Sequence, residues 1–138
     1  MKDIKILKSV KLIEGEVVNT NGVIYDKDSL SNAENNLKEM IKDCTLFTNL
    51  YSEQPKDNIT EMLTTKVDSV STIGYITNIN KESVSIRLFD NGIFIKENLN
   101  PDDFRVAYRL LGVYNNDNKF VINKIVAIDV LPKEKFVN

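Results

Sequence analysis

The feature that most constrains this chain is a succession of short apolar–polar alternations in its second half, separated by turns rich in Asn and Gly. In residues 83–89 every second residue is apolar, which is the two-residue period of a strand with one buried face. The polar triplet 80–82 separates this run from the apolar stretch 70–79. The pattern predicts a β-hairpin over 70–89.

A second hairpin is predicted over 105–114 and 119–131, around the turn sequence Asn115-Asn116-Asp117-Asn118. Pro132 ends its last strand. The residues expected to share one face of that strand are Phe120, Ile122, Val126, Ile128 and Val130. Between the hairpins we expect a short return strand at 93–95, after a tight turn at 90–92. A single helical turn or a loop is expected at 98–103.

One amphipathic helix is predicted, over about residues 27–42. Asp26 or Asp28 can cap its first turn, since a short carboxylate accepts hydrogen bonds from the first backbone N–H groups. Its apolar residues fall on one face at three- and four-residue steps: Leu30, Ala33, Leu37, Met40 and Ile41. The opposite face is polar, so the helix should lie on the outside of a sheet.

The first half adds further strand signals. Residues 4–18 are rich in β-branched side chains and predict one or two strands broken near Gly15, followed by a turn at 19–22. Residues 1–14 are expected to form an arm or a strand, and residues 45–51 another strand. The sequence thus predicts one domain over 1–138, with a loose tail at 133–138. The expected fold class is α+β, mainly β, with a six- to eight-stranded antiparallel barrel-like sheet and one flanking helix.

Composition narrows the function. A net charge of -2 over 138 residues provides no basic field to attract phosphates. Cys44 is the one cysteine, so an internal disulfide and a multi-thiolate metal site are both excluded. No stretch has the length and apolar character of a signal peptide or membrane span. We expect a soluble protein with no membrane partner, no metal and no cofactor.

The chain contains no histidine, which removes the usual general base of serine and cysteine nucleophiles. A Ser–Lys dyad remains open, but no spacing singles out a pair. Carboxylates cluster at 26/28, 53/57 and 102/103, where a helix cap, an exposed loop and a turn account for them without a catalytic or metal-binding role. The isolated glycines do not form a phosphate-binding loop.

Aromatic and basic residues on the predicted strands leave a nucleic-acid reading open, because barrels that bind single strands stack bases on such side chains. These residues are Tyr75, Arg87, Arg105, Tyr108, Arg109 and Tyr114. Tyrosines that half-pack and arginines that lie along a barrel wall explain the same pattern. The negative net charge argues against nucleic acid as the partner.

Residues 15–25, Gly-Glu-Val-Val-Asn-Thr-Asn-Gly-Val-Ile-Tyr, followed by a capped helix, resemble the opening of the prohead maturation proteases of tailed bacteriophages. These are serine proteases with a herpesvirus assemblin-like fold. In them a strand ending V-x-N-x-N-x-R-x-Y-P leads into the helix that flanks the barrel. Val23 stands at the basic position of that motif, and Asp26 replaces its proline.

The resemblance continues in order to Pro132. Ser52-Glu53-Gln54-Pro55 corresponds to a family N-H-P segment, with Gln54 at the position of the catalytic histidine. Residues 106–112 correspond to a V-S-S-R-G-x-G strand. Ala107 and Tyr108 stand at its serine positions, whereas Arg109 and Gly112 match. Residues 120–130 resemble the last barrel strand.

This resemblance implies a protease-like barrel without protease chemistry, because glutamine is no base and neither alanine nor tyrosine offers a serine hydroxyl. It implies a non-enzymatic structural protein of a phage virion that is made in the host cytoplasm and binds the capsid shell or other virion proteins. Decoration, cement and minor capsid roles all fit, as does self-association into a homo-oligomer. Two alternatives stay open, namely a β-barrel binding module for nucleic acid or a small ligand, and a regulator of an active prohead protease. The sequence names no binding residues.

Overall fold

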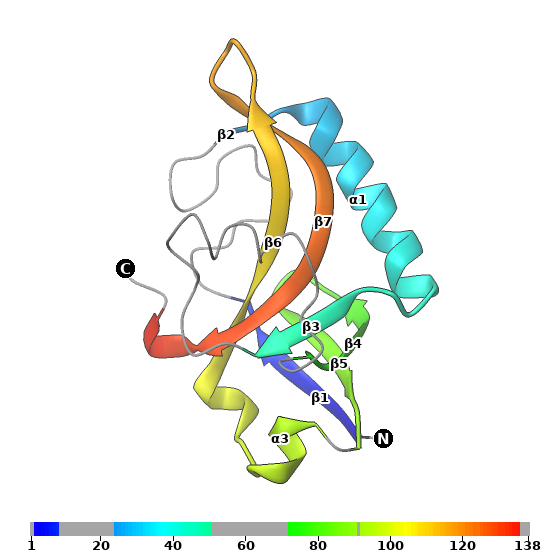
Figure 1. The fold of residues 1–138 in the computed structure, drawn as a ribbon, viewed down its shortest axis with the longest axis vertical. Coiled ribbons are helices and arrows are strands. Elements are labelled where there is room, and N and C mark those ends of the chain that lie inside the picture. Colours follow the sequence, from blue (N-terminus) through cyan, green and yellow to red (C-terminus); the bar gives the residue numbers. More distant parts are fainter. Residues whose placement is uncertain (1, 9–23, 51–71, 91, 136–138) are drawn as a thin grey trace.

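The structure, a computed structural model, describes residues 2–8, 24–50, 72–90 and 92–135. Within these residues seven strands form one sheet, and one long helix, α1 (Lys27–Lys42), lies against it (Figure 1). The predicted fold class, mainly β with six to eight strands and one flanking helix, is confirmed. The helix bounds agree with the expected 27–42.

One half of the sheet is antiparallel. Strands β1 (Lys2–Leu7), β5 (Ser83–Leu88), β4 (Thr72–Ile79) and β3 (Phe47–Leu50) follow one another in that spatial order. The pairing of β4 with β5 confirms the hairpin predicted over 70–89. β1 runs antiparallel along the other edge of β5, and β3 runs antiparallel to β4.

The other half of the sheet is organised around β7 (Lys119–Pro132). Its long neighbour β6 (Phe104–Tyr114) is antiparallel and forms the second predicted hairpin with it. The short strand β2 (Ile24–Tyr25) and the strand β3 both pair with β7 in parallel. The sheet is therefore mixed, although most of its strand pairs are antiparallel as expected. α1 links β2 to β3 as a crossover, which returns the chain in the same direction.

The sheet curls but does not close into a barrel, so the expected barrel-like form applies only loosely. Lys8, immediately after β1, forms an isolated parallel bridge with Val106 of β6. This single bridge joins the two ends of the curled sheet among the described residues, and no ladder of hydrogen bonds follows it there. A barrel requires a continuous ladder between its first and last strands.

The core lies inside the curl of the sheet. Its fully buried members come from both halves of the sheet, so no single hairpin could bury them alone. They include Ile6, Leu46, Ile76, Ile86, Val106 and Ile128. Burying side chains of this size contributes about 1.5–3 kcal/mol each.

Residues 93–95 do not form the predicted return strand. They belong to a one-turn helix, α3 (Ile93–Lys96), which begins after Gly92. Phe94 points from this turn into the core, with its ring centroid 5.0 Å from that of Phe104. A three-residue apolar run suits a strand and a helical turn equally well, and packing against Phe104 decides between them.

Two 3-10 turns are described besides these strands and helices. A 3-10 turn, η1 (Pro101–Asp103), follows Asn100, whose side-chain oxygen accepts a hydrogen bond from the Asp102 N–H; this agrees with the predicted helical turn or loop. Another 3-10 turn, η2 (Lys133–Lys135), follows β7. The expected strand signals at 9–18, the turn at 19–22 and the loop carrying Gln54 lie outside the described residues.

β7 departs from strict alternation. The register shifts twice along the β6–β7 ladder, between Arg109 and Leu110 and between Leu111 and Gly112. Each shift places an extra residue on β7, which reverses the face of the residues beyond it. Ile125 therefore joins the main core cluster, whereas Val126, which was expected to share the face of Ile128, does not.

Candidate functional site: an apolar pocket beneath α1

The N-terminal end of α1 is fixed to β7 by a chain of hydrogen bonds. Asp26 caps the helix, because its Oδ2 accepts from the backbone N–H of Ser29 at 3.0 Å. The Asp26 N–H donates to the Phe120 carbonyl at 2.9 Å, and Ser29 Oγ accepts from the Ile122 N–H at 3.0 Å. The carboxylate at 26 is thus a cap, as its sequence position indicated.

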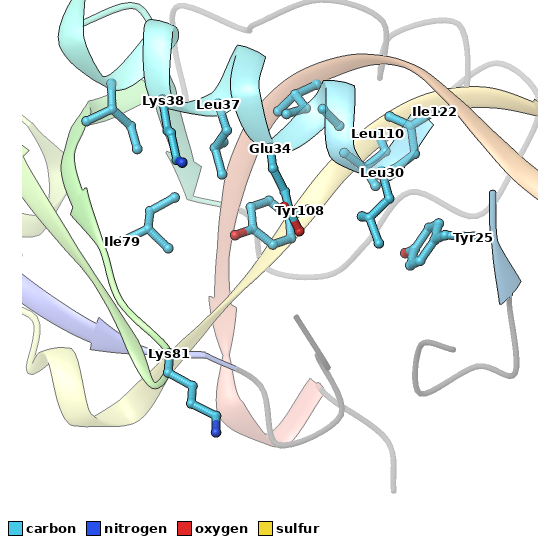
Figure 2. A pocket seen from close by; sticks show the side chains of 13 residues that line it. Tyr25, Leu30, Glu34, Leu37, Lys38, Ile79, Lys81, Tyr108, Leu110 and Ile122 are labelled. Carbon is cyan, nitrogen blue, oxygen red and sulfur yellow. The ribbon is translucent and has the colours of Figure 1, made fainter. Parts of the chain in front are cut away.

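Beyond this anchor α1 stands off from the sheet and leaves a pocket of about 450 Å³ (Figure 2). Pockets that hold small molecules or side chains of a partner have volumes of this order. The helix contributes the face that the sequence predicted to be apolar, and the sheet contributes mainly aliphatic side chains. The apolar and aromatic lining consists of Leu30, Ala33, Leu37, Ile41, Ile79, Tyr108, Leu110, Ile122, Ile125 and Tyr25.

The charged residues of the pocket are all exposed. Glu34 and Lys38 extend from α1, and Lys81 lies at the turn between β4 and β5 with its amine directed away from the helix (Figure 2). Tyr25 and Tyr108 add hydroxyl groups to the wall. An apolar interior with a polar rim can bind the apolar part of a ligand, and the charges of the rim can orient the ligand's polar groups.

A buried polar cluster lies on the opposite face of β6 from Tyr108. An Nη2 atom of Arg109 is 3.1 Å from a carboxylate oxygen of Asp129 on β7 and donates to Asn49 on β3 at 2.9 Å. Asn49 in turn donates to the Thr72 hydroxyl at 2.9 Å. Arg109, Asp129 and Asn49 are all buried, so these polar bonds tie β6, β7, β3 and β4 together.

The electrostatics of this cluster are dominated by desolvation. Burial disfavours the ionised carboxylate and raises the pKa of Asp129 from 3.8 to about 6, although the neighbouring Arg109 guanidinium acts in the opposite direction. Because Asp129 is within ion-pair distance of Arg109, the two charges compensate each other at neutral pH. The cluster is suited to holding strands together.

Ala107 and Tyr108, which the sequence resemblance aligned with the serines of the prohead proteases, fall on opposite faces of β6. Ala107 is half-buried and lies opposite Asp129 in the β6–β7 register, whereas Tyr108 contributes to the pocket wall. Gln54, which the resemblance aligned with the catalytic histidine, lies outside the described residues. The expected proximity of Gln54 and Ala107 therefore stays a prediction.

The arginines considered for nucleic-acid binding are engaged within the chain. Arg87 forms an exposed ion pair with Asp3 at 2.9 Å, which lowers the pKa of that carboxyl group. Arg105 donates to the carbonyl oxygens of Asp102 and Phe104. Since Arg109 is buried, these side chains do not form a basic strip.

The remaining residues considered from the sequence are dispersed. Tyr75 packs against Phe89, and Tyr114 is exposed at the end of the β6–β7 hairpin. Asp102 and Asp103 belong to η1, in agreement with a turn. Glu53 and Asp57 lie outside the described residues. Within the described residues no group of three His, Cys, Asp or Glu side chains is placed to hold a metal ion.

Sequence reasoning missed the pocket and the buried ion pair. Periodicity identified the apolar face of α1 but carries no information on how far the helix stands from the sheet. The ion pair had a signal, since Arg109 and Asp129 each interrupt an apolar run. A charged residue within an apolar run is buried only when it has a partner of opposite charge. Pairing Arg109 with Asp129 would have supplied that partner.

Comparisons of the chain with protein-family models, with curated proteins and with solved structures find no match. None of the helices among the described residues is long and apolar enough to cross a membrane.

Proposed function

We propose that this chain is a non-catalytic structural protein of a tailed-bacteriophage particle, which binds the capsid shell as a decoration, cement or minor capsid protein. The observation that carries the proposal is Ala107. It stands on β6, where it and Tyr108 occupy the two serine positions in the resemblance to prohead proteases, and its methyl group has no atom that can attack a peptide carbonyl.

The surroundings of Ala107 support a structural role for this strand. Asp129 lies opposite Ala107 and is occupied by its ion pair with Arg109. Both charges are buried, and Asn49 holds the arginine from the other side. The residues that flank the former nucleophile position therefore bind strands to one another, and what remains for function is binding through the surface of the sheet and α1.

Purified chain should sediment with capsids of the phage that encodes it, and mass spectrometry should find it in particles washed at high salt. The same preparation should release no peptides from an unfolded protein substrate, while an active prohead protease serves as the positive control. Absence from washed particles, or measured peptide-bond cleavage by the purified chain, would contradict the proposal.

A second candidate function is a binding module for a small apolar ligand, and the pocket beneath α1 is the observation that favours it. A fluorescent fatty-acid probe would be bound with saturable affinity in that case. Binding of nucleic acid has less support, because Arg87, Arg105 and Arg109 are engaged internally. A labelled single-stranded oligonucleotide should therefore show no salt-sensitive binding.

A further inference from the structure

The pocket beneath α1 continues into a strip of three aromatic rings at the far end of the sheet. Tyr25 on β2, Phe120 on β7 and Tyr114 on β6 form this aromatic strip. The ring centroid of Phe120 lies 6.2 Å from that of Tyr25 and 5.4 Å from that of Tyr114, both in edge-on geometry. Tyr114 is 60% exposed, which leaves this end of the strip open to solvent.

Two observations make the pocket and the aromatic strip one surface. Tyr25 belongs to the strip and also lines the pocket. Ile122, two residues after Phe120 on β7, lines the pocket as well, and residues two apart on a strand share a face. At Gly112 a side-chain carbon would lie 2.8 Å from the Phe120 ring, so the glycine makes room for that ring.

The rim of the pocket is charged but not neutralised by local pairing. Lys38 and Lys81 are exposed, and neither forms an ion pair with a carboxylate in the part of the chain that the structure describes. Glu34 is the one carboxylate among the described lining residues. The rim therefore carries a positive excess that complements an acidic partner.

We propose that the pocket and the aromatic strip together dock one amphipathic segment of a partner protein. Its apolar side chains enter the pocket and lie along the strip, and its acidic side chains face Lys38 and Lys81. A protein segment fits better than a small molecule because the apolar surface extends past the pocket onto three neighbouring strands. The inference rests on the proposed capsid function only for the identity of the partner.

The first test measures binding to capsids with the pocket filled. Ala33→Trp places an indole in the pocket from the buried face of α1, whereas Asn35→Trp adds the same bulk to an exposed position of that helix. We expect A33W to lose capsid binding at least tenfold and N35W to retain it. Circular dichroism must show that both variants fold; equal binding by a folded A33W would overturn the proposal.

The second test does not depend on capsids or on a core substitution. The probes are two short soluble peptides with a leucine face, one carrying glutamates on its other face and one carrying lysines. The acidic peptide should bind roughly three- to tenfold more tightly, the effect expected of two exposed ion pairs. NMR shifts should fall on the pocket and the aromatic strip.

The double variant K38E/K81E should reverse the preference between the two peptides. K124E/K133E, which changes two exposed lysines outside the pocket, should leave it unchanged. Equal affinity for both peptides, or shifts elsewhere on the molecule, would refute the docking surface.

Other occupants give distinct results. If the wild-type chain dimerises and A33W is monomeric, a second copy fills the pocket and the proposal is wrong. If a fatty-acid probe binds and the acidic peptide does not, the pocket is a small-ligand site and the proposal is again wrong. Peptide binding without capsid binding would refute the capsid function and leave the docking surface standing.

Discussion

Replacing Arg109 with methionine tests whether the buried polar cluster holds the sheet together. The two side chains of the Arg109–Asp129 pair are 7% and 5% exposed, so the variant leaves a carboxylate buried without its cation. Loss of one partner from a buried ion pair costs about 3–5 kcal/mol. With a urea m-value of about 2 kcal/mol/M, the unfolding midpoint followed by circular dichroism should fall by about 2 M.

The ionisation of Asp129 also makes the stability of the folded chain depend on pH. Burial raises the pKa of Asp129 to about 6 in the folded chain, against 3.8 for an unperturbed aspartate. At a pH between 3.8 and about 6, Asp129 is protonated in the native state and ionised in the unfolded state. The resulting stabilisation of the native state is complete below pH 3.8 and disappears as the pH rises through about 6.

Removal of the cation raises the pKa of Asp129 further in R109M, so the variant gains more stability than the wild type on acidification from pH 7 to pH 5. The difference in free energy of unfolding between the wild type and R109M should shrink by about 1 kcal/mol over that range. In the double variant R109M/D129L both charges are gone, and most of the lost stability should return.

Arg87→Met is the matched control, because its ion pair with Asp3 is exposed; this variant should unfold close to the wild type. Unfolding of R109M and R87M at the same urea concentration would refute the role of the buried ion pair in holding the sheet together. It is also refuted if the deficit of R109M is equal at pH 5 and pH 7.

Two further substitutions probe how the pocket is built. Gly112→Ala would place a carbon 2.0 Å from the Val121 carbonyl oxygen and 2.8 Å from the Phe120 ring, so we expect a loss of about 1–3 kcal/mol in thermal unfolding and a weaker near-ultraviolet tyrosine signal; an unchanged melting temperature would contradict this. Asp26→Ala removes the cap bond to the Ser29 N–H and should cost about 1 kcal/mol, whereas Asp26→Asn should retain most of the stability; equal losses in the two variants would show that capping is not the cause.

Local periodicity was sufficient for the elements that pair with a neighbour along the chain. In the hairpins over 70–89 and 105–131 two apolar-rich runs lie on either side of a short polar turn, so their pairing could be predicted from sequence alone. The helix was predictable for the same reason, since its apolar face and its cap at Asp26 both lie within one short segment.

The parts that could not be predicted depend on residues far apart in the sequence. The parallel pairing of Thr48 with Ile128 joins strands 80 positions apart (128 − 48), and no turn signal marks it. The buried position of Arg109 has the same origin, because Asn49 and Asp129 reach it from two other strands. The helical turn at 93–96 could not be predicted because it depends on the packing of Phe94 against Phe104.

The place of β7 in the sheet has a consequence for the order in which the protein can form during synthesis. β7 pairs with β6, β3 and β2, yet it is the last described strand to leave the ribosome. A nascent chain that stops before residue 119 can close the β4–β5 hairpin and lay β1 beside it, but α1 then lacks β7, the strand to which its N-terminal end is hydrogen-bonded. We expect such truncated chains to expose apolar surface and to require chaperones, since non-local pairing comes last and slowly.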